Sequence, residues 1–98
     1  MKQIDIYYSP VCGLCTKAIE FFYSRGVTFT SYAVEYDKEA DTFTDSQNTR
    51  EMYRRCGEEV EFVPQIFIGD RYIGGWRKLE PLIGSGEIDE LLKNLEQA

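Results

Sequence analysis

Two cysteines separated by two residues, Cys12-Gly13-Leu14-Cys15, lie between segments of different hydrophobic periodicity. Before them, residues 3–8 alternate between polar and apolar side chains, which is typical of a half-buried strand. After them, apolar residues recur at the spacing of one helix face until Arg25-Gly26: Cys15, Ala18, Ile19 and Phe22. The sequence therefore predicts a strand joined to a helix, with Cys12 at the helix start and Cys15 one turn further on the buried face.

This placement gives the two cysteines different chemistry. The first N–H groups of a helix are unpaired, and the peptide dipoles add partial positive charge there, so Cys12 should ionise more readily than a free thiol. In Cys-x-x-Cys motifs the nucleophilic thiol commonly has a pKa of ~3.5–7.5. Residues three apart on a helix lie roughly 5–6 Å from each other, close enough for a disulfide. We predict that Cys12 is the nucleophile and Cys15 the resolving thiol.

Other uses of a cysteine pair are less well supported. A zinc site needs further ligands, but the chain has no histidine and only Cys56 as another cysteine, so a carboxylate would have to complete the set. A secreted disulfide scaffold is disfavoured by the odd number of cysteines and by the lack of a recognisable leader segment. Two thiols that are merely buried in a core helix are a further alternative. Redox chemistry is the favoured interpretation.

Composition narrows the class of protein. The chain has 98 residues and a net charge of −6, which predicts one small domain over residues 1–98 and argues against nucleic acid as a partner. No apolar run approaches the ~20 residues that a membrane span needs, so we expect no membrane association. We expect a cytoplasmic, monomeric protein.

Two further segments follow the first helix. Residues Val27–Tyr36 are rich in β-branched and aromatic side chains and predict a second strand, parallel to the first. Residues Asp37–Asp45 are polar and predict a loop, in which Phe43 is either tucked against the body or exposed. Asp45 or Ser46 then caps a second helix, which ends at Gly57. Its apolar stripe is Thr49, Met52, Tyr53 and Cys56, and Cys56 is either a small buried hydrophobe or a redox residue.

The C-terminal half predicts a hairpin and helices. Residues 61–68 and 71–75 form two apolar strands around Gly69-Asp70, with Pro64 at a strand start because proline cannot donate to a ladder. Two core helices are expected to follow: a short apolar turn over residues 79–83, which makes an extra short helix possible, and a last helix with Ile88, Leu91, Leu92 and Leu95. The fold class is therefore α/β, with a mixed four-stranded sheet flanked by helices. A Cys-x-x-Cys motif at the first strand–helix turn makes it thioredoxin-like.

The second half of the chain resembles the glutaredoxin family. The resemblance rests on residues 63–69, which include Val63-Pro64, on Ile73-Gly74-Gly75, on residues 79–92, and on residues 51–57 at the end of the second helix. It implies that Val63-Pro64 is a cis dipeptide beside the cysteines. It also implies a glutathione site, in which the backbone of Val63 pairs with the cysteinyl portion and the turn after Gly74-Gly75 holds the γ-glutamyl end. The implied site residues are Val63, Pro64, Gly75, Trp76 and Arg77.

The chain departs from the family pattern around this site. Gly13 and Leu14 replace the usual Pro-Tyr between the cysteines, and Phe62 replaces a threonine. The basic residue that usually precedes the first cysteine is missing, unless Gln47 or Arg50 serves in its place. Trp76-Arg77-Lys78 stands where many members have a small residue and two aspartates, which removes an acidic partner for the α-amino group of glutathione. Trp76 either packs over the active site or supports the last helix.

The resemblance implies two functions of different kinds. The first is a glutathione-dependent thiol–disulfide oxidoreductase, which reduces protein disulfides or protein–glutathione mixed disulfides. The second is a carrier or sensor that binds a [2Fe-2S] cluster between two protomers through Cys12 and glutathione. Retention of Cys15 favours the enzyme, whereas Gly13 favours the carrier. Within the enzyme class, a flavoprotein such as thioredoxin reductase is a third hypothesis for the electron donor.

Overall fold

The computed structural model describes residues 3–96, which fold around a four-stranded mixed sheet in the order β2-β1-β5-β6. A separate two-stranded ribbon is formed by β3 and β4. In chain order the elements are β1 (Ile4–Tyr8), α1 (Gly13–Ser24), β2 (Phe29–Ala33), β3 (Tyr36–Asp37), β4 (Thr42–Phe43), α2 (Gln47–Cys56), β5 (Gln65–Ile68), β6 (Arg71–Gly74), α3 (Trp76–Ser85) and α4 (Glu87–Glu96).

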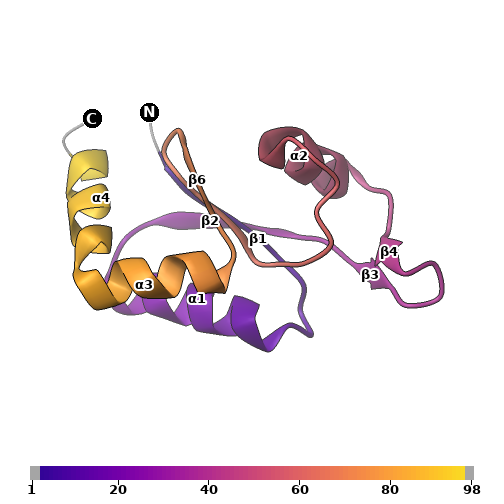
Figure 1. Cartoon of the computed structure of the whole chain (residues 1–98), viewed down its shortest axis with the longest axis horizontal. Helices are drawn as coiled ribbons and strands as arrows, with labels where there is room; N and C mark the ends of the chain where they lie inside the picture. Colours follow the sequence, from indigo (N-terminus) through magenta and orange to yellow (C-terminus); the bar gives the residue numbers. More distant parts are fainter. Residues whose placement is uncertain (1–2, 97–98) are drawn as a thin grey trace.

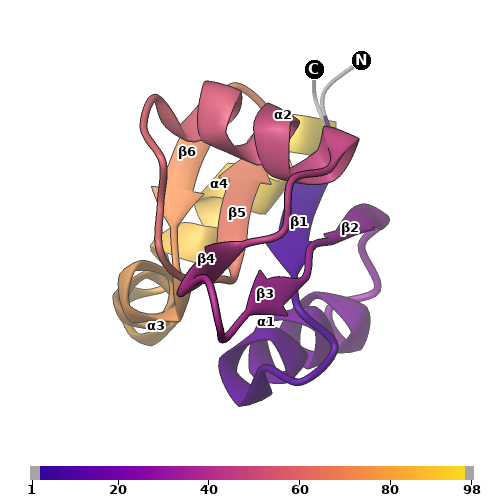
Figure 2. The same ribbon diagram turned by 90° about the vertical axis from the view of Figure 1, so that its right-hand side faces the viewer.

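Within the four-stranded sheet, the parallel pair β1–β2 and the hairpin β5–β6 are as the sequence predicts. β1 and β2 are parallel, with Ile6 opposite Ser31, while β1 and β5 are antiparallel, with Ile6 opposite Ile66. β5 and β6 form the predicted antiparallel hairpin and lie side by side in the sheet (Figure 2). Their register shifts between Ile66 and Phe67. The predicted α/β class and thioredoxin-like arrangement are confirmed. Because β1 and β2 run in the same direction, both end at the same edge of the sheet, and the chain leaves β1 there towards Cys12.

The two faces of the sheet bury separate apolar clusters. Helix α2 lies on the opposite side of the sheet from α1 and α3 (Figure 1). Alternation along β1 sends Ile4 and Ile6 into the larger cluster, with Phe22 of α1 and Leu79 of α3, and sends Tyr7 into the smaller one with Met52 of α2. Helix α4 adds Ile88 and Leu92 to the larger cluster. No helix in residues 3–96 is long and apolar enough to cross a membrane.

A nearly buried ion pair holds α2 against the sheet. Asp5 in β1 is 5% exposed, and its Oδ2 accepts a hydrogen bond of 2.9 Å from Nη1 of Arg55. The guanidinium of Arg55 also lies 4.1 Å from the centre of the Phe67 ring. Gln3 donates to the other oxygen of Asp5 at 2.8 Å. The carboxylate is thus surrounded by donors, as a charge removed from water requires.

The segment between α1 and α2 differs from the sequence prediction. The predicted strand over Val27–Tyr36 is too long, because regular pairing stops at Ala33. The predicted loop over Asp37–Asp45 is wrong, because Tyr36–Asp37 and Thr42–Phe43 pair as the ribbon β3–β4. Phe43 is only 5% exposed, and its ring meets that of Tyr36 edge-on at 5.4 Å. Burial of Phe43 against the smaller cluster gives this polar segment the apolar contact it needs to order.

The first C-terminal helix is longer than the sequence predicts. The core helix expected over residues 79–83 is part of a helix of ten residues, α3, that begins at Trp76. Pro81 lies inside α3, and the helix ends where Gly86 adopts a left-handed conformation with φ of 84°. Pro81 is the sixth residue of α3 and has no N–H, so the helix lacks one backbone hydrogen bond there. Burial of Leu79 in the larger cluster stabilises the helix despite this loss.

Candidate active site

Cys12 is the N-cap of α1. Its backbone is extended, with φ of −96° and ψ of 116°, and its sulfur accepts a hydrogen bond of 3.2 Å from the backbone N–H of Cys15. Its own N–H donates to the carbonyl oxygen of Ser9 at 3.1 Å, which fixes the turn that precedes the helix. The sulfur therefore occupies the place of a capping oxygen, where unpaired N–H groups and the helix dipole favour a negative charge.

Cys15 lies in a contrasting environment. Its side chain is 1% exposed, on the inner face of α1. Burial raises the pKa of the Cys15 thiol to about 12, with a further contribution from its hydrogen bond to Cys12. The protonated form of Cys15 is therefore strongly favoured near neutral pH. Cys12 is half-buried whereas Cys15 is buried, so Cys12 is the more accessible thiol of the pair.

This contrast predicts selective alkylation. With the reduced protein at about pH 8, we expect iodoacetamide to modify Cys12 first and to leave Cys15 largely unmodified, because a thiol with a pKa of about 12 is protonated there. Modification of Cys15 should increase as the pH rises towards that value. Peptide mapping by mass spectrometry measures both sites. Faster labelling of Cys15 than of Cys12 in the folded protein would contradict the assignment.

The loop before β5 faces Cys12. The peptide bond between Val63 and Pro64 is cis, and the carbonyl oxygen of Val63 lies 3.5 Å from the Cys12 sulfur. The side chain of Gln65, at the start of β5, is fully buried and stabilises this loop. Its Nε2 donates to the carbonyl oxygen of Phe62 at 2.8 Å, and its Oε1 accepts from the hydroxyl of Tyr72. Sequence reasoning placed Gln65 only as a strand residue. Its amide, polar in an otherwise apolar strand, was the signal that could have identified it.

Gly74 at the end of β6 and Gly75 after it are required by backbone conformation and close packing. Gly74 has φ of 109°, a conformation that other residues rarely adopt. A Cβ on Gly75 would lie 2.7 Å from the ring of Phe62 and 3.3 Å from the carbonyl oxygen of Pro64. The absence of both side chains lets the start of α3 lie directly against the Phe62–Pro64 loop.

A groove of about 410 Å³ runs beside this junction. Leu14, Phe62 and Trp76 give it apolar walls, Val63, Pro64 and Gly75 contribute loop backbone, and Arg77 and Lys78 add positive charge. All five residues that the resemblance assigned to glutathione are thus brought together. Trp76 lines the groove and also packs against the larger cluster, which includes Ile88 and Leu92 of α4.

The two residues considered as replacements for the missing basic anchor lie elsewhere. Neither Gln47 nor Arg50 is among the residues that line the groove. Arg50 makes two hydrogen bonds to Asp45, of 2.8 and 2.6 Å. This ion pair lowers the pKa of the Asp45 carboxyl. Gln47 lines a different hollow, at the end of β2.

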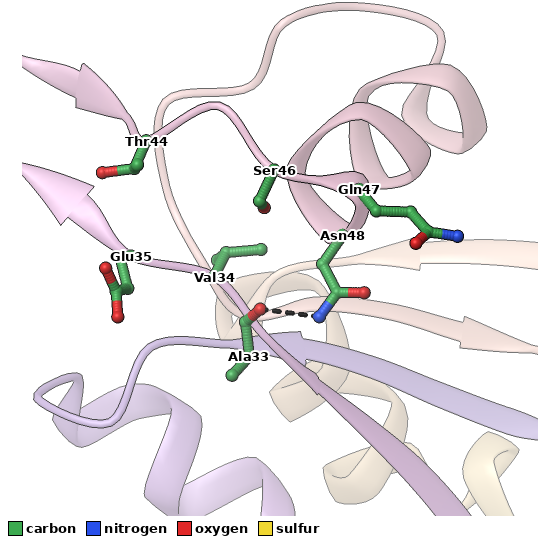
Figure 3. Close-up of a pocket in the computed structure, with 7 residues that line it drawn as sticks. All are labelled: Ala33, Val34, Glu35, Thr44, Ser46, Gln47 and Asn48. Carbon is green, nitrogen blue, oxygen red and sulfur yellow. Dashed lines mark hydrogen bonds between the residues drawn. The ribbon is translucent and has the colours of Figure 1, made fainter.

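In that second hollow, the start of α2 is hydrogen-bonded to the end of β2. Figure 3 shows the amide of Asn48 joined to the carbonyl oxygen of Ala33, at 2.8 Å. Ser46, which lines the same hollow, caps α2 by accepting from the N–H of Thr49 at 3.1 Å. Its lining residues are Ala33, Val34, Glu35, Thr44, Ser46, Gln47 and Asn48. Neither a thiol nor a cationic side chain is among them.

Cys56 is separate from the other two cysteines. It ends α2, is half-buried, and packs against the smaller apolar cluster. Burial raises the pKa of its thiol. Within residues 3–96, no group of three or more Cys, His, Asp or Glu side chains is placed to hold a metal ion. Cys56 therefore adds no third ligand to the Cys12–Cys15 pair.

Comparisons with known proteins agree with this geometry. The family model described as Glutaredoxin matches residues 4–73. A probable glutaredoxin of Synechocystis is 33% identical over 90 residues, which cover 92% of each chain. Glutaredoxin 3 of Escherichia coli is 32% identical over 93 residues, covering 95% of this chain and all of the relative.

Among solved structures, a complex of buckwheat glutaredoxin with glutathione superposes with a TM-score of 0.72. The superposition covers 95% of this chain and 78% of the buckwheat chain at 18% identity, and it supports the fold. With the thiol pair at the helix start, the cis-proline loop and the double glycine all in one site, this chain belongs to the glutaredoxin family and is a thiol–disulfide oxidoreductase.

Proposed function

We propose that the protein uses glutathione to reduce protein disulfides and protein–glutathione mixed disulfides, with Cys12 as the nucleophile and Cys15 as the resolving thiol. The observation that carries this proposal is the position of the Cys12 sulfur. It accepts the N–H of Cys15 at 3.2 Å, lies 3.5 Å from the carbonyl oxygen of Val63, and is next to the groove that Val63 lines.

The first step is exchange at Cys12. Its thiolate attacks one sulfur of the substrate disulfide, so a Cys12–substrate S–S bond forms while the original bond breaks. The leaving sulfur departs as a thiolate and takes a proton from solvent. The Cys12 sulfur, which accepts the N–H of Cys15 at the start of α1, is the leaving group in the second step.

Two routes resolve the mixed disulfide. If the group held on Cys12 is glutathione, a second glutathione attacks it and leaves as oxidised glutathione. If the group is a protein, the thiol of Cys15 loses its proton and attacks Cys12, which releases the reduced protein and leaves a Cys12–Cys15 disulfide. Two glutathione molecules then restore the dithiol and become oxidised. Cys15 is one helical turn from Cys12, which suits the second route.

The groove supports glutathione as the co-substrate. Glutathione is an extended peptide with two carboxylates, and Val63, Pro64, Gly75, Trp76 and Arg77 line a groove of suitable character next to Cys12. We assign the backbone of Val63 and Pro64 to its cysteinyl portion, Gly75 and Trp76 to its γ-glutamyl end, and Arg77 to a carboxylate. The glutathione complex of the buckwheat relative supports this assignment by analogy of fold.

Other features of the proposal follow from this chemistry. We infer a monomer that works in the cytoplasm, where glutathione keeps thiols reduced. Its partners are glutathione and proteins with disulfides or bound glutathione. The iron–sulfur alternative is not favoured, because the relatives support the oxidoreductase and because Cys15 is retained beside Cys12.

A coupled assay tests the dependence on glutathione. We expect rapid turnover of a glutathione mixed disulfide, seen as NADPH oxidation through glutathione reductase, with a rate that rises with glutathione concentration. In a parallel reaction, thioredoxin reductase replaces glutathione and its reductase. Turnover only in the parallel reaction would overturn glutathione as the donor, and would identify a flavoprotein in its place.

A further inference from the structure

Exposed apolar side chains surround Cys12. Val11, directly before it, is 90% exposed, Leu14 is 41% exposed, and Phe62 is 55% exposed. Leu14 and Phe62 both line the groove, although they are 48 positions apart, because the Phe62–Pro64 loop lies beside the start of α1. Large apolar side chains left in solvent around a reactive sulfur are typical of a surface that a partner covers.

The charge on the groove is opposite to that of the chain. The chain carries −6, yet Arg77 and Lys78 line the groove, and no acidic residue is among those that line it within the described residues. Four of the five other arginines in this part of the chain form ion pairs with carboxylates, namely Arg25–Asp89, Arg50–Asp45, Arg54–Glu51 and Arg55–Asp5, and the fifth, Arg71, lies in β6 outside the groove. Within residues 3–96, Arg77 and Lys78 take part in no such ion pair.

Packing holds the stem of Lys78 close to the groove. A Cβ on Gly74 would lie 3.1 Å from Cγ of Lys78, so the aliphatic part of the lysine lies directly over that glycine. Lys78 itself is exposed, so its stem packs over Gly74 while its charged end stays in solvent at the edge of the groove that the residue lines. Two cations beside apolar walls fit a ligand that offers an apolar side chain together with a carboxylate.

We propose that the groove selects protein substrates in which the reacting cysteine is flanked by an apolar residue and, within a few positions, by an acidic residue. This inference rests on the proposed exchange at Cys12. The groove is used twice in one cycle: first by the substrate segment, while the substrate sulfur is bonded to Cys12, and then by glutathione. Arg77 and Lys78 should attract an acidic substrate segment, whereas the net charge of −6 should repel it at long range, so the two charge effects predict opposite preferences.

Single-turnover exchange tests the proposal without glutathione. The reduced protein is mixed with peptides that carry one cysteine as a neutral mixed disulfide with 2-mercaptoethanol, in the contexts Leu-Cys-Glu, Leu-Cys-Lys and Ser-Cys-Glu. The second-order rate constants are measured by rapid acid quench and mass spectrometry. We expect Leu-Cys-Glu to react at least about threefold faster than either alternative at low ionic strength, and the advantage of Glu over Lys to decrease at about 0.5 M salt.

Charge variants identify the residue responsible. Lys78→Gln, which keeps the stem over Gly74, should reduce the ratio of the Glu to the Lys peptide, and Lys78→Glu should invert it. Lys38→Glu makes the same change of charge in the exposed turn between β3 and β4, and it should leave the ratio unchanged. The ratio is measured within each variant, so a lower overall rate does not obscure it.

The outcomes separate this inference from the proposed function. Equal rates for the three peptides, or a Lys38→Glu effect as large as that of Lys78→Glu, would overturn the substrate preference. In either case, reduction of bis(2-hydroxyethyl) disulfide by the same protein would leave exchange at Cys12 standing. Failure to react with that small neutral disulfide would instead overturn the proposed function, and the inference with it.

Discussion

Cys12→Ser is expected to remove disulfide turnover, with a loss of at least about a thousandfold. A serine hydroxyl can accept the same hydrogen bond from the N–H of Cys15, so α1 stays capped, but it does not ionise near neutral pH and forms no S–S bond. Cys15 cannot take over, because it is 1% exposed and burial raises its pKa to about 12. Turnover of the glutathione mixed disulfide in the coupled assay measures the loss.

Cys56→Ser is the matched control for this variant. It makes the same change of sulfur to oxygen, at the end of α2 and outside the groove. We expect its turnover to stay close to that of the unmodified protein. Residual activity of Cys12→Ser above a few per cent, or a comparable loss in Cys56→Ser, would show that another thiol attacks the substrate.

Cys15→Ser is expected to separate the two routes of resolution. Turnover of glutathione mixed disulfides should persist, because a second glutathione can attack glutathione held on Cys12. Reduction of protein disulfides should fall by at least about tenfold, because the mixed disulfide between Cys12 and the substrate protein loses the thiol that lies one helical turn away. The measurements are the coupled assay and reduction of a protein disulfide such as that of insulin.

The trapped intermediate supplies an independent readout. In Cys15→Ser, a covalent complex between Cys12 and the substrate protein should accumulate and survive non-reducing electrophoresis, and addition of dithiothreitol should release it. If Cys15→Ser reduced both substrates at the rate of the unmodified protein and trapped no complex, Cys15 would not be the resolving thiol.

The local parts of this site could be predicted from the sequence. The change from period-two to helical periodicity at Cys12 predicts where α1 begins, and the capping geometry agrees with it. Alternation in β1 predicts that Ile4 and Ile6 share a buried face, but the strand is not half-buried as expected, because Tyr7 on its other face is buried in the smaller cluster. Gly57 and the Gly69-Asp70 turn mark a helix end and a hairpin that the structure contains. These features depend on interactions between residues close in sequence, so the residue types at a few positions are enough to determine them.

The remaining features depend on contacts between distant residues. Phe43 is buried because α2 and the end of β2 provide a surface for it, and this contact converts a polar segment into the ribbon β3–β4. Asp5 and Arg55 pair across 50 positions, and nothing in the local sequence distinguishes either from a surface charge.

The same limit applies to the groove. Leu14, Phe62 and Trp76 come from three separate segments, which meet where Gly75 packs against Phe62 and Pro64 and where Val63 contacts Cys12. By itself, the sequence determined the reactive pair, the elements that flank it and the family. The tertiary structure decided which side chains surround the pair and that unpaired cations line its groove, because those properties arise from burial and proximity between segments rather than from periodicity along the chain.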